Sequence, residues 1–440
     1  MTPGGRIAAA IEILDLVHAR KAPADRLASD YFRARRFIGS KDRTAISGLV
    51  YGVLRKRAQL EWWLARVREG AARVPFAPNG RSWLLAYLAI VETWEAGRIE
   101  HAFSGERYDP QPLQVHEQAS IASLAGRSLD HPEQSDWVRF NLPPWAAERF
   151  TQRFGERARA EMAAMGTEAP LDLRVNVLKG KRDAARKALK EAGITTEATK
   201  MSPWGLRTEE RANVMASAPY KAGLVEIQDE GSQLVALLVD AKPGMRVCDF
   251  CAGAGGKTLA IAATMENKGQ IVACDTSEKR LAGATTRLRR AEVHNVERRL
   301  LESERDGWVK KHKGGFDRVL VDAPCTGTGT WRRNPDARWT LVRDEIAELT
   351  AKQARILESA ARLVKPGGRL IYATCSVLPE ENEAQAEAFL AAQSDFAPVP
   401  VAQVWEKAGE GTTLSLSPAK DGTDGFFVAV FERKEASPPA

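Results

Sequence analysis

The fold of this chain is decided by residues 246–258, which read RVCDFCAGAGGKT. A short apolar run ends at Phe250, glycine occupies positions 253, 255 and 256, and an apolar helical pattern then begins. Glycine at a strand-to-helix turn lets the backbone approach a ligand closely, and the helix N-terminus favours an anionic group. We therefore interpret this stretch as a strand, a ligand-binding turn and the start of a helix.

The alternation of strand and helix patterns continues through the C-terminal half of the chain. Strands are expected at 246–250, 270–275, 316–322, 369–374 and 425–432, and helices at 257–265, 277–292 and 344–364. This order is typical of an α/β fold, in which a mostly parallel sheet has helices on both faces. Ligands of such sheets bind at the carboxyl ends of the strands, which is where the polar motifs of this chain fall.

Two nucleotide-binding motifs can be excluded for the glycine turn. A P-loop, GxxxxGK[ST], would need glycine where this chain has Cys251, and a dinucleotide fingerprint, GxGxxG, would need glycine at Thr258. Asp275 lies 19 residues after Gly256, at the end of the next strand, where a carboxylate can bind the two hydroxyls of a ribose. A ribose-bearing ligand without a pyrophosphate fits, and S-adenosylmethionine is the obvious candidate. The alternative is a structural glycine turn in which Asp275 caps the next helix.

The cysteines predict thiol chemistry rather than disulfides or metal binding. There are five, namely Cys248, Cys251, Cys274, Cys325 and Cys375, and an odd number argues against a disulfide framework. No histidine lies close to any of them in the sequence, so no metal site is expected. Cys325 and Cys375 each follow a strand at the ligand-bearing edge, which favours a catalytic thiol, whereas a lone cysteine there is usually core filler.

The first 70 residues contain the whole excess of positive charge. They hold 14 Lys and Arg against 7 Asp and Glu, whereas the remaining 370 residues hold 50 of each kind. A local basic excess favours a polyanion-binding surface, with nucleic acid as the first candidate, and a solvated basic face is the alternative. No run reaches 18 apolar residues and the N-terminus lacks the apolar core of a signal peptide, so we expect a cytoplasmic protein without a membrane span.

The N-terminal half is predicted to be largely helical. Residues 5–70 and 80–130 repeat apolar residues at helical spacing, and the stripe from Trp83 to Trp94 predicts core packing. A small α+β segment is expected next, with one helix at 145–165 and another near 182–192.

Four longer segments together resemble one known family. They match, in order and in spacing, the Rsm/Nop/Sun family of RNA cytosine-C5 methyltransferases: IQDEGSQLVA (227–236), DFCAGAGGKT (249–258), FDRVLVDAPCTGTG (316–329) and ATCSVLPEEN (373–382). Residues 1–70 also resemble the NusB-like RNA-binding domain of the bacterial rRNA members. The resemblance implies three domains: an α-helical NusB-like RNA-binding domain at 1–135, a small α+β RNA-binding segment at 136–220, and an α/β class I, Rossmann-like S-adenosylmethionine-dependent methyltransferase domain at 221–440.

The resemblance also implies site residues. The cofactor loop would consist of Cys251, Ala252, Gly253, Ala254, Gly255, Gly256 and Lys257. Asp275 would bind the ribose, Asp322 would lie near the cofactor or the cytosine ring, and Glu302, or alternatively Asp306, would contact the adenine. The chain departs from the family pattern in two places: the loop reads CAGAGGK where CAAPGGK is usual, and Thr326 stands where Ser is common.

The cysteines take distinct roles by this resemblance. Cys375 would be the nucleophile that adds to C6 of cytosine, and Cys325 would assist product release. DNA cytosine methyltransferases instead use the cysteine of a Pro-Cys motif, so Cys325 is the alternative nucleophile. Thiolate addition makes C5 electron-rich enough to attack a methyl sulfonium, and a hydrogen bond to N3, from Asp322 in its protonated form, would stabilise the adduct. The target base must be single-stranded or flipped out of its helix.

Taken with this resemblance, the sequence predicts a monomeric RNA cytosine-C5 methyltransferase that acts on small-subunit (16S) rRNA. The alternatives are a tRNA cytosine-C5 methyltransferase, a non-catalytic RNA-binding ribosome assembly factor and a Rossmann dehydrogenase. An assembly factor would have no need for the combination of Cys375, Cys325, Asp275 and Asp322. A dehydrogenase is disfavoured by the failed glycine fingerprint and leaves the two cysteines unexplained.

Overall fold

The structure is a computed structural model that describes residues 1–20, 22–71, 78–208, 213–341 and 343–435. The chain divides into two compact units: a helical unit, Met1–Thr167 with Trp331–Arg343, and a sheet unit, Glu168–Thr330 with Asp344–Ala440. The three domains expected at 1–135, 136–220 and 221–440 are not tested by this division and stay a prediction.

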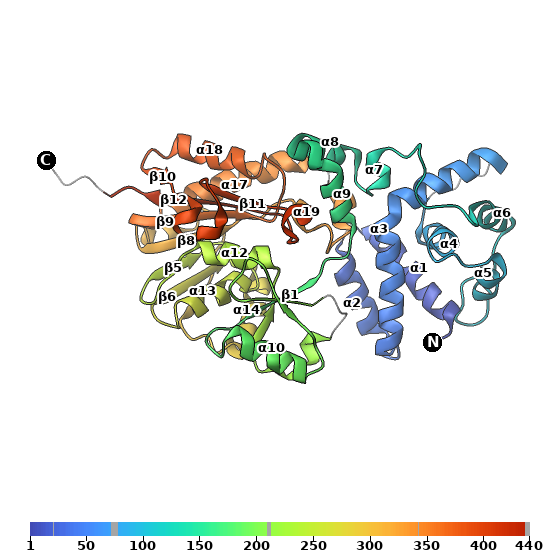
Figure 1. Cartoon of the computed structure of the whole chain (residues 1–440), viewed down its shortest axis with the longest axis horizontal. Helices are drawn as coiled ribbons and strands as arrows, with labels where there is room; N and C mark the ends of the chain where they lie inside the picture. Colours follow the sequence, from blue (N-terminus) through green and yellow to red (C-terminus); the bar gives the residue numbers. More distant parts are fainter. Residues whose placement is uncertain (21, 72–77, 209–212, 342, 436–440) are drawn as a thin grey trace. The chain divides into compact units, whose positions relative to one another are not determined.

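The helices of the helical unit between residues 3 and 124 pack around one apolar core (Figure 1). Its helices are α1 (Pro3–Arg20), α2 (Ala24–Ala34), α3 (Ser40–Ala71), α4 (Gly80–Ile90), α5 (Ala96–Ala102), α6 (Val115–Leu124), α7 (Asp136–Arg139), α8 (Pro144–Phe154), α9 (Ala158–Gly166) and α16 (Ala337–Thr340). Trp83, Leu84 and Leu88 on α4 are completely buried, which confirms the expected core stripe. The single helix expected at 145–165 is wrong, because Gly155 adopts a φ of +53° and separates α8 from α9.

A short segment from the C-terminal half of the sequence belongs to the helical unit. It spans Trp331–Arg343 and contains α16. The completely buried guanidinium of Arg338 donates hydrogen bonds to the backbone carbonyls of Asn141 and Met165, at 2.8 and 3.0 Å. Because this segment lies between two parts of the sheet unit in the sequence, the units are joined by three covalent connections rather than one.

The sheet unit contains a large sheet whose strand order is β10-β12-β9-β8-β5-β6-β7, with β11 paired to β12 (Figure 1). Its strands are β5 (Arg246–Asp249), β6 (Gln270–Asp275), β7 (Val296–Leu300), β8 (Phe316–Asp322), β9 (Val364–Thr374), β10 (Phe396–Pro398), β11 (Thr413–Leu416) and β12 (Phe426–Arg433). The pairs that join β7, β6, β5, β8 and β9 are parallel, which confirms the expected sheet. The sequence did not reveal β7, because this edge strand is mostly exposed and reads VERRL.

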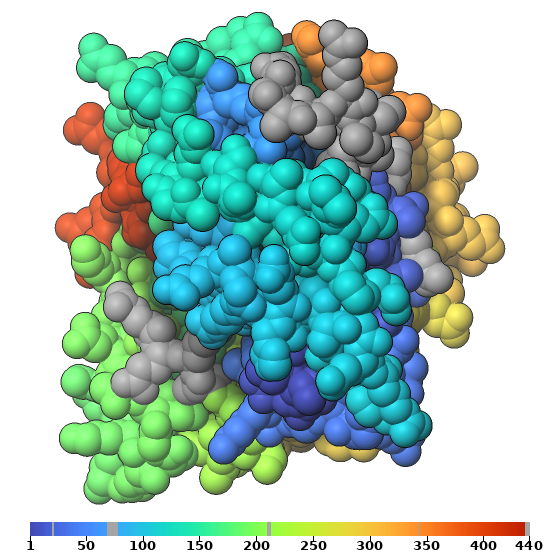
Figure 2. Space-filling view, turned by 90° about the vertical axis from the view of Figure 1, so that its right-hand side faces the viewer, coloured from blue at the N-terminus to red at the C-terminus, as the bar shows by residue number. Residues whose placement is uncertain are grey.

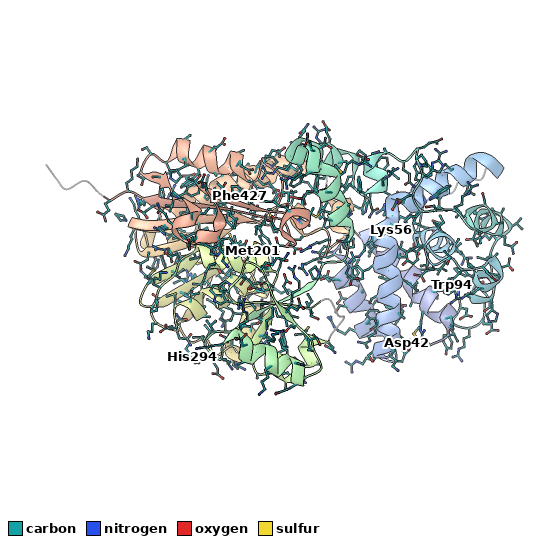
Figure 3. All side chains as sticks on the ribbon, viewed as in Figure 1. Asp42, Lys56, Trp94, Met201, His294 and Phe427 are labelled. Carbon is teal, nitrogen blue, oxygen red and sulfur yellow. The ribbon has the colours of Figure 1, made fainter. Side chains whose placement is uncertain are left out.

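Alternating side chains of the strands pack into two separate apolar layers. Val247 and Ile271 belong to one layer, whereas their neighbours Cys248 and Val272 belong to the other, as does the completely buried Phe427 (Figure 3). From residue 230 onward, the helices of this unit are α12 (Glu230–Leu238), α13 (Gly256–Thr264), α14 (Glu278–Arg290), α15 (Gly307–Lys311), α17 (Glu345–Ala361), α18 (Glu383–Ala392) and α19 (Pro418–Asp421). Helices therefore cover both faces of the sheet, and its central strands read as continuous apolar runs.

A small antiparallel sheet of order β2-β3-β1-β4 begins the sheet unit. Its elements are β1 (Leu171–Val175), α10 (Arg182–Glu191), β2 (Glu197–Ala198), β3 (Gly205–Thr208), α11 (Ala218–Lys221) and β4 (Val225–Ile227).

Short 3₁₀ helices occur in both units, at Gly155–Arg157, Val214–Ala216, Thr328–Thr330, Val401–Gln403 and Glu406–Ala408. In the described part of the chain, no helix is both long enough and apolar enough to cross a membrane.

Candidate cofactor and catalytic site

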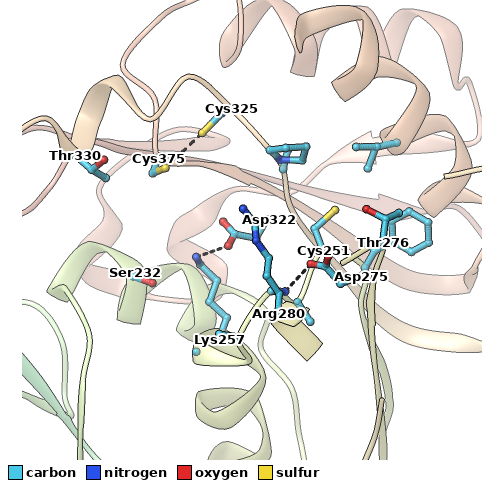
Figure 4. Close-up of a pocket in the computed structure, with 18 of the residues that line it drawn as sticks. Ser232, Cys251, Lys257, Asp275, Thr276, Arg280, Asp322, Cys325, Thr330 and Cys375 are labelled. Carbon is cyan, nitrogen blue, oxygen red and sulfur yellow. Dashed lines mark hydrogen bonds and ion pairs between the residues drawn. The ribbon is translucent and has the colours of Figure 1, made fainter. Parts of the chain in front are cut away.

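A cavity of about 710 Å³ lies at the carboxyl ends of β5, β6, β8 and β9 (Figure 4). The site residues expected from the sequence line it, apart from Gly255 and Glu302: Cys251, Ala252, Gly253, Ala254, Gly256, Lys257, Asp275, Asp322, Cys325 and Cys375. Its volume is within the range of small-molecule sites. Among the described residues, no group of three or more His, Cys, Asp or Glu could hold a metal ion.

The glycine turn is held by two arginines from other elements. Gly255 precedes α13 with a φ of +78°, a left-handed conformation that favours glycine. Arg174 of β1 donates to the carbonyl oxygen of Gly256 at 2.7 Å, and Arg287 of α14 donates to that of Ala254 at 2.9 Å. The sequence did not single out either arginine, because both lie far from the turn in the chain.

Asp275 ties two segments of the site together and also faces the cavity. Its carboxylate accepts hydrogen bonds from the backbone N–H of Gly253 at 2.8 Å and from that of Ser277 at 2.7 Å, so it ties the glycine turn to the start of α14. It also lines the cavity at the end of β6. A carboxylate oxygen has two lone pairs, and one backbone bond to each leaves capacity to accept from ribose hydroxyls. The site therefore fits the ribose of S-adenosylmethionine.

Lys257 and Asp322 form the charged centre of the cavity (Figure 4). Lys257 Nζ lies 2.6 Å from Asp322 Oδ2. Burial by itself would lower the pKa of Lys257, but the Asp322 carboxylate raises it above its ordinary value. Lys257 is therefore an ammonium group.

The two cysteines expected to be catalytic lie in contact. Cys325 Sγ is 3.4 Å from Cys375 Sγ, although the residues are 50 positions apart in the sequence. Their loops are joined by a backbone bond from Gly329 N–H to the Cys375 carbonyl and by a hydrogen bond between Thr328 Oγ1 and Ser376 Oγ, each 3.0 Å. The contact with Cys375, and then burial, raise the pKa of the Cys325 thiol well above its ordinary value. Cys325 is therefore a protonated thiol that can donate to its neighbour.

The acidic residues proposed for the adenine lie at the margin of the site. Glu302 is exposed and is not among the described residues that line the cavity, and Asp306 caps α15 by accepting from the backbone N–H of Trp308. The residues of this stretch that do line the cavity are Leu301 and Glu304. The adenine contact by Glu302 stays a prediction.

Asp249, at the end of β5, is a buried acid that the sequence did not single out. Its Oδ2 accepts from Thr258 Oγ1 at 2.7 Å, and its buried Oδ1 has no hydrogen-bond partner in the described structure. Burial raises the pKa of Asp249 from 3.8 to about 7. The folded state therefore holds a proton that the unfolded chain has already released at pH 5–7.

We expect the Asp249→Asn variant to gain stability relative to the wild type as the pH rises. The raised pKa makes the contribution of Asp249 to stability complete below pH 4 and lost as the pH rises towards 7, by up to roughly 4 kcal/mol. Asn keeps an acceptor for Thr258 but does not titrate. Calorimetric melting temperatures of both proteins between pH 5 and 8 would measure this, with the exposed Asp183→Asn as control. Parallel pH profiles for wild type and Asp249→Asn would contradict the buried-proton interpretation.

We expect Asp275→Ala to bind S-adenosylmethionine about 10- to 100-fold more weakly, because hydrogen bonds to a carboxylate contribute about 1.5–3 kcal/mol. Isothermal titration calorimetry measures the affinity directly. Glu278→Ala is the matched control, since it removes an exposed carboxylate from the first turn of α14. An unchanged Kd for Asp275→Ala would mean that the carboxylate only holds the glycine turn.

Solved structures share this fold. PH0851 has 25% sequence identity to this chain and a TM-score of 0.79, with 98% of this chain and 99% of that chain covered. A methyltransferase homologue from Pyrococcus horikoshii has 31% identity and a TM-score of 0.59, with 68% of this chain and 97% of that chain covered.

Sequence comparisons identify the family. A family model described as 16S rRNA methyltransferase RsmB/F matches residues 236–432, and a model of the ferredoxin-like domain of RsmF/B-like methyltransferases matches residues 142–215. The chain is 33% identical to the ribosomal RNA small subunit methyltransferase B of Klebsiella pneumoniae (strain 342), over 89% of this chain and 90% of that relative. This chain therefore belongs to the RsmB/F family of 16S rRNA methyltransferases, which use S-adenosylmethionine.

Proposed function

We propose that this protein methylates C5 of a cytosine in small-subunit rRNA through a covalent bond between Cys375 and C6 of the base. The observation that carries the proposal is the contact of Cys325 and Cys375, 3.4 Å apart, in the cavity that also contains Asp275 and the glycine turn. Two thiols in contact beside a cofactor cavity suit a reaction in which one thiol bonds to the base and the other moves a proton. The names of the relatives support rRNA as the substrate, and we propose that the enzyme acts as a cytoplasmic monomer.

Addition to the base begins the reaction. The Cys375 thiolate forms a bond to C6, and the electrons of the C5–C6 double bond move into the ring, which makes C5 nucleophilic. Asp322 presents a proton to N3, and Lys257 Nζ, 2.6 Å away, can supply it. S-adenosylmethionine supplies the methyl group that C5 takes up.

Release requires a proton to leave C5. The Cys375–C6 bond breaks and its electron pair returns to sulfur, while the C5 proton departs and the C5–C6 double bond re-forms. The base returns its N3 proton through Asp322 to Lys257. Cys325 donates its S–H proton to the leaving sulfur of Cys375 and takes up the C5 proton. The Cys375 thiol then releases one proton to solvent before the next round, so protons and charge balance. Its protonated state and its 3.4 Å distance from Cys375 suit this role.

We expect the wild type to form a denaturation-resistant adduct with small-subunit rRNA that contains 5-fluorocytosine, in the presence of S-adenosylmethionine. Fluorine at C5 cannot leave as a proton, so the covalent intermediate should accumulate. Cys375→Ala should form none, and Cys325→Ala should still form it. Denaturing gel electrophoresis of labelled RNA measures the adduct.

The other outcomes of this experiment separate the alternatives. Loss of the adduct only in Cys325→Ala would exchange the roles of the two cysteines. An adduct with tRNA but not with rRNA would change the substrate. Tight RNA binding without any adduct would indicate that the protein is a non-catalytic assembly factor.

A hollow on the helical unit supports RNA binding there. Its volume is about 730 Å³, and the lining residues Phe37 and Tyr108 are 77% and 66% exposed. Arg35 and Arg107 also line it, each with its guanidinium over a tyrosine ring, and the lining carboxylate of Glu12 is paired with Arg35. In Figure 2, dark-blue residues from the start of the chain are visible between cyan and blue segments of this unit. Aromatic rings and guanidinium planes of this kind stack on unpaired RNA bases.

We expect Phe37→Ala and Tyr108→Ala each to weaken binding of single-stranded rRNA fragments by roughly 5- to 100-fold, since stacking contributes about 1–3 kcal/mol per base. S-adenosylmethionine affinity should not change. Fluorescence anisotropy measures RNA binding, and Val115→Ala, which truncates an 83% exposed side chain on α6, is the control. Equal RNA affinity in all the variants would exclude the hollow as a contact.

A further inference from the structure

Glu381 is a completely buried acid beside the catalytic cysteines, and the mechanism above does not use it. It lies between β9 and α18, and no ion pair with it is found in the described part of the chain. Burying a carboxylate without a cation is unfavourable unless hydrogen bonds replace the lost water. The hydrogen bonds that Glu381 makes therefore show what keeps this acid buried beside the two thiols.

The hydrogen bonds of Glu381 are directed at the Cys325 loop. Its Oε1 accepts from the backbone N–H of Thr326 at 2.8 Å, and its Oε2 accepts from Thr326 Oγ1 at 2.6 Å. The side-chain amide of Gln353 donates to Oε1 of Glu381 and to the carbonyl oxygen of Pro324, each at 3.0 Å. The carboxylate thus holds the residue that follows Cys325 by two bonds, while Gln353 joins it to the residue that precedes Cys325.

The same acid also connects the two cysteine loops. Thr326 Oγ1 lies 3.2 Å from Ser376 Oγ, next to Cys375 in the chain. The backbone carbonyl of Glu381 accepts from the hydroxyl of Tyr372 on β9 at 2.6 Å, which fixes the Glu381 backbone to the strand that ends just before Cys375. Removing the carboxylate would leave the Thr326 N–H without its acceptor and free the Cys325 loop to move away from Cys375.

We propose that Glu381 is a positioning residue that holds the Cys325 thiol against Cys375 for the release step. This inference rests on the proposed function and adds to it a residue that touches neither base nor cofactor. The negative charge of Glu381 also helps to keep Cys325 protonated, which is the state that release requires. Without this support, Cys325 would fail to take up the C5 proton and to free Cys375, so the enzyme would stop at the covalent stage.

The test uses rRNA with ordinary cytosine, on which the wild type should turn over without accumulating an adduct. We expect Glu381→Ala to lower turnover on the order of 100-fold, as for a group displaced by about 1 Å, and to accumulate the covalent RNA complex at least tenfold over the wild type. Glu381→Gln, which keeps an acceptor for the Thr326 N–H, should restore most turnover. Glu387→Ala on α18 removes an exposed carboxylate and should behave as the wild type.

One double variant and a second single variant test whether Glu381 acts through Cys325. The double variant Cys325→Ala/Glu381→Ala should accumulate no more adduct than Cys325→Ala alone, because both substitutions remove the same function, release assisted by Cys325. Thr326→Val loses the hydroxyl contacts with Glu381, Ser376 and Thr328 but keeps the backbone N–H bond to Glu381. It should accumulate adduct to a smaller extent, and it tests the inference if Glu381→Ala does not fold. Reduced turnover without accumulation in Glu381→Ala and Thr326→Val would overturn the role of Glu381. Failure of the wild type to form the 5-fluorocytosine adduct, measured in parallel, would instead count against the proposed function.

Discussion

The site depends on one constraint, which is that parallel strands bring their carboxyl ends to the same edge of a sheet. Neighbouring strands lie about 4.8 Å apart, and β5, β6, β8 and β9 end at this edge. The hydrogen-bond ladder between β8 and β9 places the loops that follow Asp322 and Thr374 side by side. This pairing brings Cys325 and Cys375 to 3.4 Å, and neither loop could do so by itself.

Three acids, Asp249, Asp275 and Asp322, lie near the ammonium group of Lys257 at this edge of the sheet. Each acid is stabilised in a different way. Asp322 is paired with Lys257, Asp275 accepts two backbone N–H groups, and Asp249 takes up a proton because of its burial. Three ionised carboxylates around one ammonium would repel one another, so protonating the most buried of them relieves the repulsion.

The sequence was sufficient to place most of the strands and the cofactor loop. Central strands such as β6 and β8 are buried on both faces and therefore read as continuous apolar runs between turn residues. It was insufficient for β7, whose edge position leaves a charged sequence, and for the break between α8 and α9, where Gly155 within a helical pattern gave only a weak signal. The segment Trp331–Arg343 was also missed, because its partners lie about 170–200 positions away in the chain, as in the bonds from Arg338.

The sequence alone determined most of the strands and helices of this protein and the residue types at its candidate site. Local patterns are sufficient for this, since glycines at a strand-to-helix turn and cysteines directly after strands can be recognised within a few residues of sequence. Only the tertiary structure decided which groups act together. Arg174 holds the carbonyl of Gly256 from 82 positions away, and Glu381 holds Thr326 from 55 positions away. A buried hydrogen bond needs both partners at the correct distance, and for partners far apart in the chain the packing of strands and helices sets that distance rather than any local pattern.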